Sequence, residues 1–176
     1  MTVNTALLRA ILILPGNVLV VVPALILWLS GWSPNEWQAS PATLVALALA
    51  VLLAGLGFTL MVRTVGLFLR RGQGTPAPWD PPRKLVVEGV YRHVRNPMIS
   101  GVICALLAEA LAFWSWPLCV WAALFVAVNM LYMPLSEEPG LERRFGAAYR
   151  TYKANVPRWI PRFRPWAGED LTPDRS

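Results

Sequence analysis

Four apolar stretches alternate with polar segments along this chain. They run approximately over residues 6–29, 42–69, 98–113 and 118–135. A helix needs about 20 mainly apolar residues to cross a bilayer. The pattern therefore predicts an all-α integral membrane protein with about four transmembrane helices. The last two are short and are joined by the uncharged turn 114–117, so they should form a helical hairpin.

Proline and glycine mark special positions inside the first two stretches. Pro15 and Pro23 interrupt the first stretch, which membrane helices tolerate when neighbouring helices satisfy the freed carbonyl groups. Gly55 and Gly57 lie in the second, where small residues let two helix backbones approach closely.

A proline-rich polar connector precedes the third stretch, and a polar helix is predicted after the fourth. The connector, residues 72–97, is too long for a simple turn. Beyond residue 140, apolar residues recur at helical spacing with arginines opposite, at Leu141, Phe145, Ala148, Tyr149 and Tyr152. This predicts an amphipathic C-terminal helix that Pro157 ends. Its apolar face would lie on the membrane interface or cover the connector.

These elements divide the chain into three parts. Residues 1–71 form an N-terminal membrane segment of two helices, and residues 72–165 hold the connector, the hairpin and the C-terminal helix. Residues 166–176 have the composition of a frayed tail.

Composition and charge support a membrane location. The chain is 56% hydrophobic, above the roughly 45–50% of ordinary soluble domains, and carries a net charge of +6. The basic residues flank the apolar stretches and are absent from the connectors 30–41 and 114–117. By the positive-inside rule, both termini and both polar segments are expected to be cytoplasmic. Because the basic residues follow apolar stretches and form no face of a soluble domain, they argue against nucleic-acid binding.

The residues that commonly bind metals give no metal-site pattern. Cys104 and Cys119 both lie within apolar stretches, where they are expected to be small buried side chains. His93 is the only histidine. We therefore predict no metal site.

The predicted topology brings two charged motifs to one membrane face. The segment 89–98 holds a histidine, a tyrosine and two arginines, and the pair Glu137-Glu138 follows about forty residues later. Polar groups at a membrane boundary are costly unless they are solvated, paired or bound. The two motifs together suggest a site for a charged small molecule beside a route for lipid. Each alone has a structural explanation: Asn96 and Pro97 as a helix start, and glutamates paired with nearby arginines.

Glu109 is a separate candidate, because it lies well inside the third apolar stretch. A charge there is expensive. The side chain could be protonated, pair with Arg63, line a wet cavity, or contact a substrate.

Three blocks of the sequence resemble a known family. They are Gly-Val-Tyr-Arg-His-Val-Arg-Asn-Pro-Met-Ile-Ser-Gly (89–101), Glu-Glu-Pro-Gly-Leu-Glu-Arg-Arg-Phe-Gly-Ala-Ala-Tyr-Arg-Thr-Tyr (137–152) and Val-Pro-Arg-Trp-Ile-Pro (156–161). Together they resemble the isoprenylcysteine carboxyl methyltransferase family and, more loosely, the related phospholipid methyltransferases. The resemblance covers about residues 83–165. It implies an integral membrane methyltransferase that uses S-adenosylmethionine, with the cofactor pocket in the last two spans, the connector and the tail.

The resemblance also implies individual cofactor contacts. The connector would supply backbone contacts from Arg83, Lys84, Leu85 and Val86, and Tyr91 would pack on the cofactor. The family's Arg-His-Pro-x-Tyr block corresponds here to Arg95, Asn96, Pro97, Met98 and Ile99, with asparagine for histidine and isoleucine for tyrosine. Glu137 matches the family's cofactor-binding carboxylate.

One departure bears on the substrate. Isoprenylcysteine enzymes carry an arginine for the substrate carboxylate at the position of Met133. Because methionine cannot neutralise a carboxylate, this departure argues against a prenylcysteine substrate unless Arg63 or another basic group compensates. The expected acceptor is a small lipophilic or lipid-borne molecule. A carboxylate or thiolate acceptor needs no general base, whereas for an amine or hydroxyl Glu138 and His93 are weak candidates. No catalytic residue is assigned.

Two other functions fit the same pattern. One is an NADPH-dependent membrane reductase of the sterol-reductase type, whose C-terminal half is similarly helical. The other is a membrane scaffold that keeps the fold without catalysis.

Overall fold

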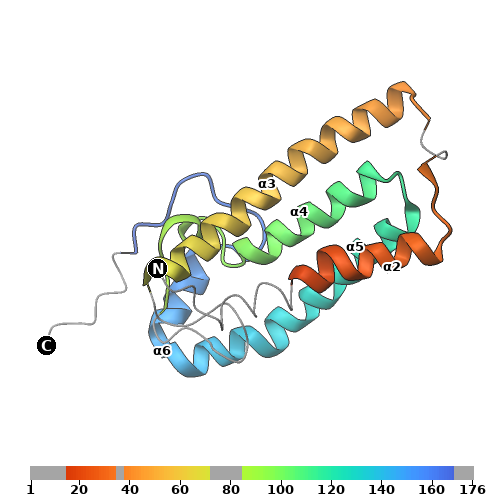
Figure 1. Cartoon of the computed structure of the whole chain (residues 1–176). Coiled ribbons are helices and arrows are strands. Elements are labelled where there is room, and N and C mark those ends of the chain that lie inside the picture. Colours follow the sequence, from red (N-terminus) through yellow and green to blue (C-terminus); the bar gives the residue numbers. More distant parts are fainter. Residues whose placement is uncertain (1–14, 35–37, 72–84, 169–176) are drawn as a thin grey trace, which may run out of the picture.

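The computed structural model describes residues 15–34, 38–71 and 85–168 (Figure 1). These residues form helices and connecting segments without any strand, which confirms the all-helical class. The elements in chain order are η1 (Asn17–Val21), α2 (Val22–Leu29), α3 (Pro41–Arg71), η3 (Gly89–Arg92), α4 (Pro97–Ala112), α5 (Trp116–Tyr132), η4 (Met133–Glu137) and α6 (Glu138–Asn155). Of these, η1 and η4 are π-helical and η3 is a short 3₁₀ helix.

Two helices are long and apolar enough to cross a membrane. They are Pro41–Leu67, at about 40 Å, and the continuous helix Trp116–Asn155. The apolar helices Asn17–Leu29 and Pro97–Ala112 are shorter. The predicted first span began near residue 6, and its first part lies outside the described residues.

The longer helices begin with proline in the first turn, where a missing N–H costs no helical hydrogen bond. Helix α3 has an additional cap. Ser40 N–H donates to Thr43 Oγ1 at 2.8 Å, and Thr43 N–H donates to Ser40 Oγ at 3.2 Å. This reciprocal pair satisfies free N–H groups at the helix start.

Helix α4 lies between α3 and α5, and α2 lies along α5 (Figure 1). The backbones of α3 and α4 approach closely at Gly57 and Gly101. A Cβ atom added at Gly57 would lie 2.6 Å from the Gly101 carbonyl oxygen. The prediction for Gly57 is confirmed, whereas that for Gly55 is wrong, since a Cβ there would meet nothing within 4 Å.

The first helical segment packs against the hairpin of α4 and α5. Buried Leu106 and Ala122 form the centre of this contact, with Val18 against them. Trp121 Nε1 also donates to the Val18 carbonyl at 3.2 Å. At the hairpin turn, Trp32 Nε1 donates to the Phe113 carbonyl at 2.8 Å. Two tryptophans therefore join the N-terminal part to the hairpin.

The fourth apolar stretch continues into the C-terminal helix without a break, whereas two separate helices were expected. The π-helical segment η4 joins α5 to α6 and contains Pro134. Because proline lacks the N–H of the regular hydrogen-bond ladder, wider local winding fits this position. Within α6, Gly146 has φ of 55° and kinks the helix.

Helix α6 ends at Asn155, just before Pro157 as predicted. Its residues Tyr149 and Tyr152 are buried, and Leu85 and Val87 of the connector pack against them. The apolar face of α6 therefore covers the connector, which was one of the two predicted positions.

Candidate functional site

The two charged motifs meet at one end of the helical bundle, where η3, the start of α4, α6 and the tail converge (Figure 1). The tail runs beside the segment 92–95. Three backbone hydrogen bonds join them: Arg95 N–H to Pro157 O, Arg162 N–H to His93 O, and Trp166 N–H to Arg92 O. This pairing fixes the segment that precedes α4.

Side chains reinforce the pairing. His93 Nδ1 lies 2.8 Å from the Arg162 carbonyl, and Arg92 Nε donates to the Trp166 carbonyl. Trp166 is buried and packs on Tyr152, with ring centroids 6.0 Å apart. The ordered chain thus extends through Trp166, where a frayed tail was expected. His93 holds the tail in place, which leaves its ring little freedom to act as a base.

Glu138 is the centre of a buried ion cluster. Its side chain is 3% exposed. Arg158 donates to both carboxylate oxygens, at 2.6 and 2.9 Å, and Arg95 Nη1 donates to Oε1 at 2.8 Å. Lys153 Nζ lies 3.3 Å from Oε2. Three cations from α6, the tail and the α4 start therefore share one carboxylate.

The cluster decides how Glu138 titrates. Burial raises the pKa of its carboxyl, but the hydrogen bonds and charges of Arg158, Arg95 and Lys153 outweigh burial and lower it overall. A carboxylate with a low pKa that already accepts several hydrogen bonds is a weak proton acceptor. The geometry therefore favours a structural role for Glu138.

Glu137 has different surroundings. It is half-buried, and within the described residues it forms no ion pair. Burial, followed by the negative charge of Glu138, raises the pKa of the Glu137 carboxyl. Its charge also raises the pKa of Tyr91, the other predicted cofactor contact.

Tyr91 is held by its backbone. Its N–H donates to the Glu88 carbonyl at 3.0 Å within η3, and its carbonyl accepts from Tyr152 Oη at 2.8 Å. Burial, with the charge of Glu137, raises the pKa of Tyr91 well above its usual range. The phenol therefore stays protonated.

The first turn of α4 borders this site. Asn96 occupies the predicted N-cap position, but its side chain makes no capping bond. Its backbone carbonyl instead accepts from Ser100 N–H and Ser100 Oγ, both at 3.0 Å. Pro97 is fully buried, while Met98 and Ile99 are half-buried. The side-chain amide of Asn96 is therefore not used by the helix.

The other predicted residues divide between the site, the core and the undescribed connector. Leu85 and Val86 are half-buried, and Leu85 packs on the tyrosines of α6. Arg83 and Lys84 lie outside the described residues. Met133 is buried within η4, at 4% exposure, one helical turn before Glu137.

Glu109 does not belong to this site. It lies about 20 Å along α4 from Asn96, towards the opposite end of the bundle. The possible pair with Arg63 is not formed, since Glu109 makes no ion pair within the part of the chain that the structure describes.

Sequence analysis expected the glutamates to pair with nearby arginines, but it did not name the partners of Glu138. Arg158 stands in the Val-Pro-Arg-Trp-Ile-Pro block and Lys153 on α6, and both are brought to Glu138 by the return of the tail. The Val-Pro-Arg-Trp-Ile-Pro block at 156–161 was the available signal, but it did not say which acid Arg158 meets. Within the described residues, no group of three His, Cys, Asp or Glu side chains could hold a metal.

Comparison with family models identifies the chain. A model described as phospholipid methyltransferase matches residues 43–148, which is more than half of the sequence. The chain belongs to the phospholipid methyltransferase family. The match runs from the start of α3 into α6 and includes η3, the first turn of α4 and both glutamates. No curated protein and no solved structure matches.

Membership gives a coarse function. The family implies methyltransferase activity on lipid-type substrates. It also implies association with a membrane, in accord with the two long apolar helices. Of the two related families that the sequence resembles, the matching one is the family that it resembles more loosely. The match favours a methyltransferase over a sterol-reductase-type enzyme.

Proposed function

We propose that this phospholipid methyltransferase family member transfers a methyl group from S-adenosylmethionine to a small lipophilic or lipid-borne acceptor at the cytoplasmic membrane face. The observation that carries the proposal is Glu137, a half-buried carboxylate that has no ion pair within the described residues and whose charge raises the pKa of Tyr91. A half-buried carboxylate without a counter-ion is destabilised, and a cationic ligand would neutralise its charge.

The residues of the site offer both polar groups and a packing surface to the cofactor. Glu137 would accept hydrogen bonds from the ammonium or ribose groups of the cofactor, and Tyr91 would pack against the cofactor. The unused side-chain amide of Asn96 adds a polar group at the start of α4. Arg83, Lys84, Leu85, Val86, Arg95, Pro97, Met98 and Ile99 remain proposed contacts from the connector and the first turn of α4.

The protein's part in the reaction is positioning. The bound cofactor supplies an activated methyl group on a sulfonium, so in-line approach of donor and acceptor is the main requirement. The ion cluster of Glu138 joins the tail, α6 and the start of α4. These contacts would hold Glu137 and Tyr91 in fixed positions. No base is assigned, because His93 and Glu138 are both engaged in structural bonds.

The acceptor would enter from the bilayer between spans. Buried Met133, one turn from Glu137, gives this side of the site an apolar wall. Such a wall suits an apolar acceptor body better than a carboxylate. We further propose four spans with both termini cytoplasmic, so that the cofactor arrives from the cytoplasm.

The test uses protein purified in a non-ionic detergent. We expect S-adenosylhomocysteine to raise the melting temperature and NADPH to leave it unchanged. We also expect labelled methyl groups to pass from S-adenosylmethionine to one or more components of a total lipid extract. Stabilisation by NADPH alone would contradict the proposal, and cofactor binding without transfer to any lipid would favour the scaffold.

A further inference from the structure

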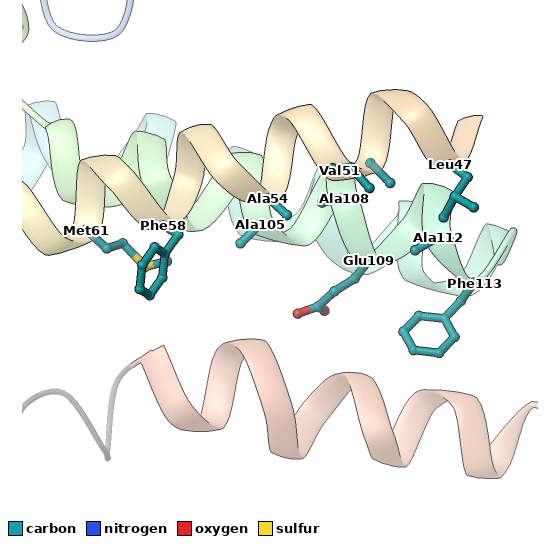
Figure 2. A pocket seen from close by; sticks show the side chains of 11 residues that line it. Leu47, Val51, Ala54, Phe58, Met61, Ala105, Ala108, Glu109, Ala112 and Phe113 are labelled. Carbon is teal, nitrogen blue, oxygen red and sulfur yellow. The ribbon is translucent and has the colours of Figure 1, made fainter. Parts of the chain in front are cut away.

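A groove of about 410 Å³ runs along the contact of α3 and α4, away from the polar end of the bundle (Figure 2). Its walls are mainly apolar side chains of these two helices, among them Leu47, Ala54, Phe58, Met61 and Ala108. Along α3 the lining from Leu47 to Met61 spans about 20 Å. The shape suits an extended aliphatic chain.

One residue in this wall is charged in water. Glu109 lines the groove from α4, and its side chain lies between those of Phe58 and Phe113 in the view of Figure 2. Its Oε2 atom is buried and has no hydrogen-bond partner within the described residues. An unpaired buried polar atom destabilises the fold, and more so when the group is charged. An apolar residue would fill this wall at no such cost.

The groove is separate from the proposed cofactor site. Glu109 lies about 20 Å along α4 from Asn96, so a ligand paired with Glu109 keeps its polar end far from Glu137. This inference therefore does not rest on the proposed function.

We propose that the groove is a binding site for a lipophilic amine, whose nitrogen pairs with Glu109 and whose aliphatic chain lies along α3 and α4. An ammonium group supplies both the hydrogen-bond donor that Oε2 lacks and the opposite charge. A fatty acid would place a second carboxyl beside Glu109, and a bare hydrocarbon would leave Oε2 unpaired. Charge complementarity thus selects the amine among lipid-like ligands.

Photoaffinity labelling tests the assignment. The probe is dodecylamine carrying a diazirine midway along its chain, added to the full-length protein in non-ionic detergent, with the matching dodecanol probe as reference. We expect the amine probe to label residues of the groove about tenfold more than the alcohol, and Glu109→Gln to remove that preference. Equal labelling by the two probes, or labelling that Glu109→Gln leaves unchanged, would overturn the proposal.

Two further variants distinguish loss of the groove from a general folding defect. Ala54→Leu fills the groove from an exposed position of α3, so it should reduce labelling by the amine without changing Glu109. Ala48→Leu makes the same change on an exposed position of α3 outside the lining, and should label as the wild type does. Labelling of Ala54→Leu at the wild-type level would place the probe elsewhere and contradict the assignment.

Discussion

Glu137 and Glu138 are neighbours in sequence, yet the structure places them in opposite electrostatic surroundings. Glu138 is buried beneath Arg95, Lys153 and Arg158, and its pKa is lowered. Glu137 forms no ion pair within the described residues, and its pKa is raised by burial and by Glu138. Because successive residues of a helix point about 100° apart, adjacent side chains can reach different partners.

The contrast assigns the two carboxylates different functions. Glu138 contributes to stability, since it neutralises cations from three segments that are distant in sequence. Glu137 forms no ion pair within the described residues, and a cationic ligand would neutralise its charge. Stability and ligand binding should therefore be separable by mutation at this pair.

The largest effect is expected from Glu138→Gln. Removing one partner of a buried ion pair leaves uncompensated charge, here on Arg95 and Arg158, and costs about 3–5 kcal/mol. The measurement is thermal unfolding in detergent, which should show a markedly lower midpoint. Glu142→Gln is the matched control, because the Glu142 side chain is 36% exposed and its contacts with Lys153 and Arg150 are 3.9 Å long. Equal midpoints for the two variants would remove the ion cluster from the account.

A packing defect of intermediate size shows whether lost stability alone weakens ligand binding. A Cβ atom at Gly101 would lie 2.9 Å from the Gly57 carbonyl oxygen, so Gly101→Ala should force the helices apart at about 1–3 kcal/mol. Gly55→Ala, which meets nothing within 4 Å, should keep the wild-type midpoint. Because the crossing lies away from Glu137, both variants should bind S-adenosylhomocysteine as the wild type does below their melting temperatures.

Ligand binding by Glu137 and the stability that Glu138 provides should be lost at different pH values. A cation binds the deprotonated form of Glu137, whose pKa is raised, so affinity for S-adenosylhomocysteine should fall on acidification before an ordinary glutamate titrates. The stability that Glu138 contributes is present above its ordinary pKa and is lost only as the pH falls through its lowered value. Binding should thus weaken at a higher pH than that at which the protein unfolds. Coincident midpoints in a titration followed by binding and by unfolding would contradict this order.

The smallest effect is expected for the stability of Glu137→Gln. Because folding raises the pKa of Glu137, its ionised form is slightly unfavourable in the folded protein at neutral pH. Glutamine removes that charge, so the free energy of unfolding should stay within about 0.5 kcal/mol or rise slightly. A clear loss of stability in thermal unfolding would show that Glu137 has a structural partner.

Much of the fold was predictable because hydrophobic patterning is a local signal. The apolar stretches gave α3, α4 and α5 to within a few residues, and Pro97 and Pro157 correctly marked helix boundaries. The motif at 89–98 and the glutamate pair were correctly expected to meet. Topology does this, since an even number of helical passes returns the chain to the same end.

The features that the sequence did not predict depend on tertiary contacts. The bonds that hold Trp166 join residues more than seventy positions apart, so the tail looked frayed by composition. Which glutamate meets Arg158 depends on helix phase through the π-helical segment η4, and a one-residue change in winding would exchange Glu137 and Glu138. For the same reason, sequence alone gave no preference between Gly55 and Gly57 for the crossing.

The most direct test of the central claim is calorimetric titration of S-adenosylhomocysteine into the wild type and Glu137→Gln at neutral pH. A charge-assisted hydrogen bond is worth about 1.5–3 kcal/mol, so we expect binding to the variant to be about ten- to a hundredfold weaker at an unchanged melting temperature. Equal affinity in a folded Glu137→Gln protein would contradict the claim that Glu137 binds the cofactor.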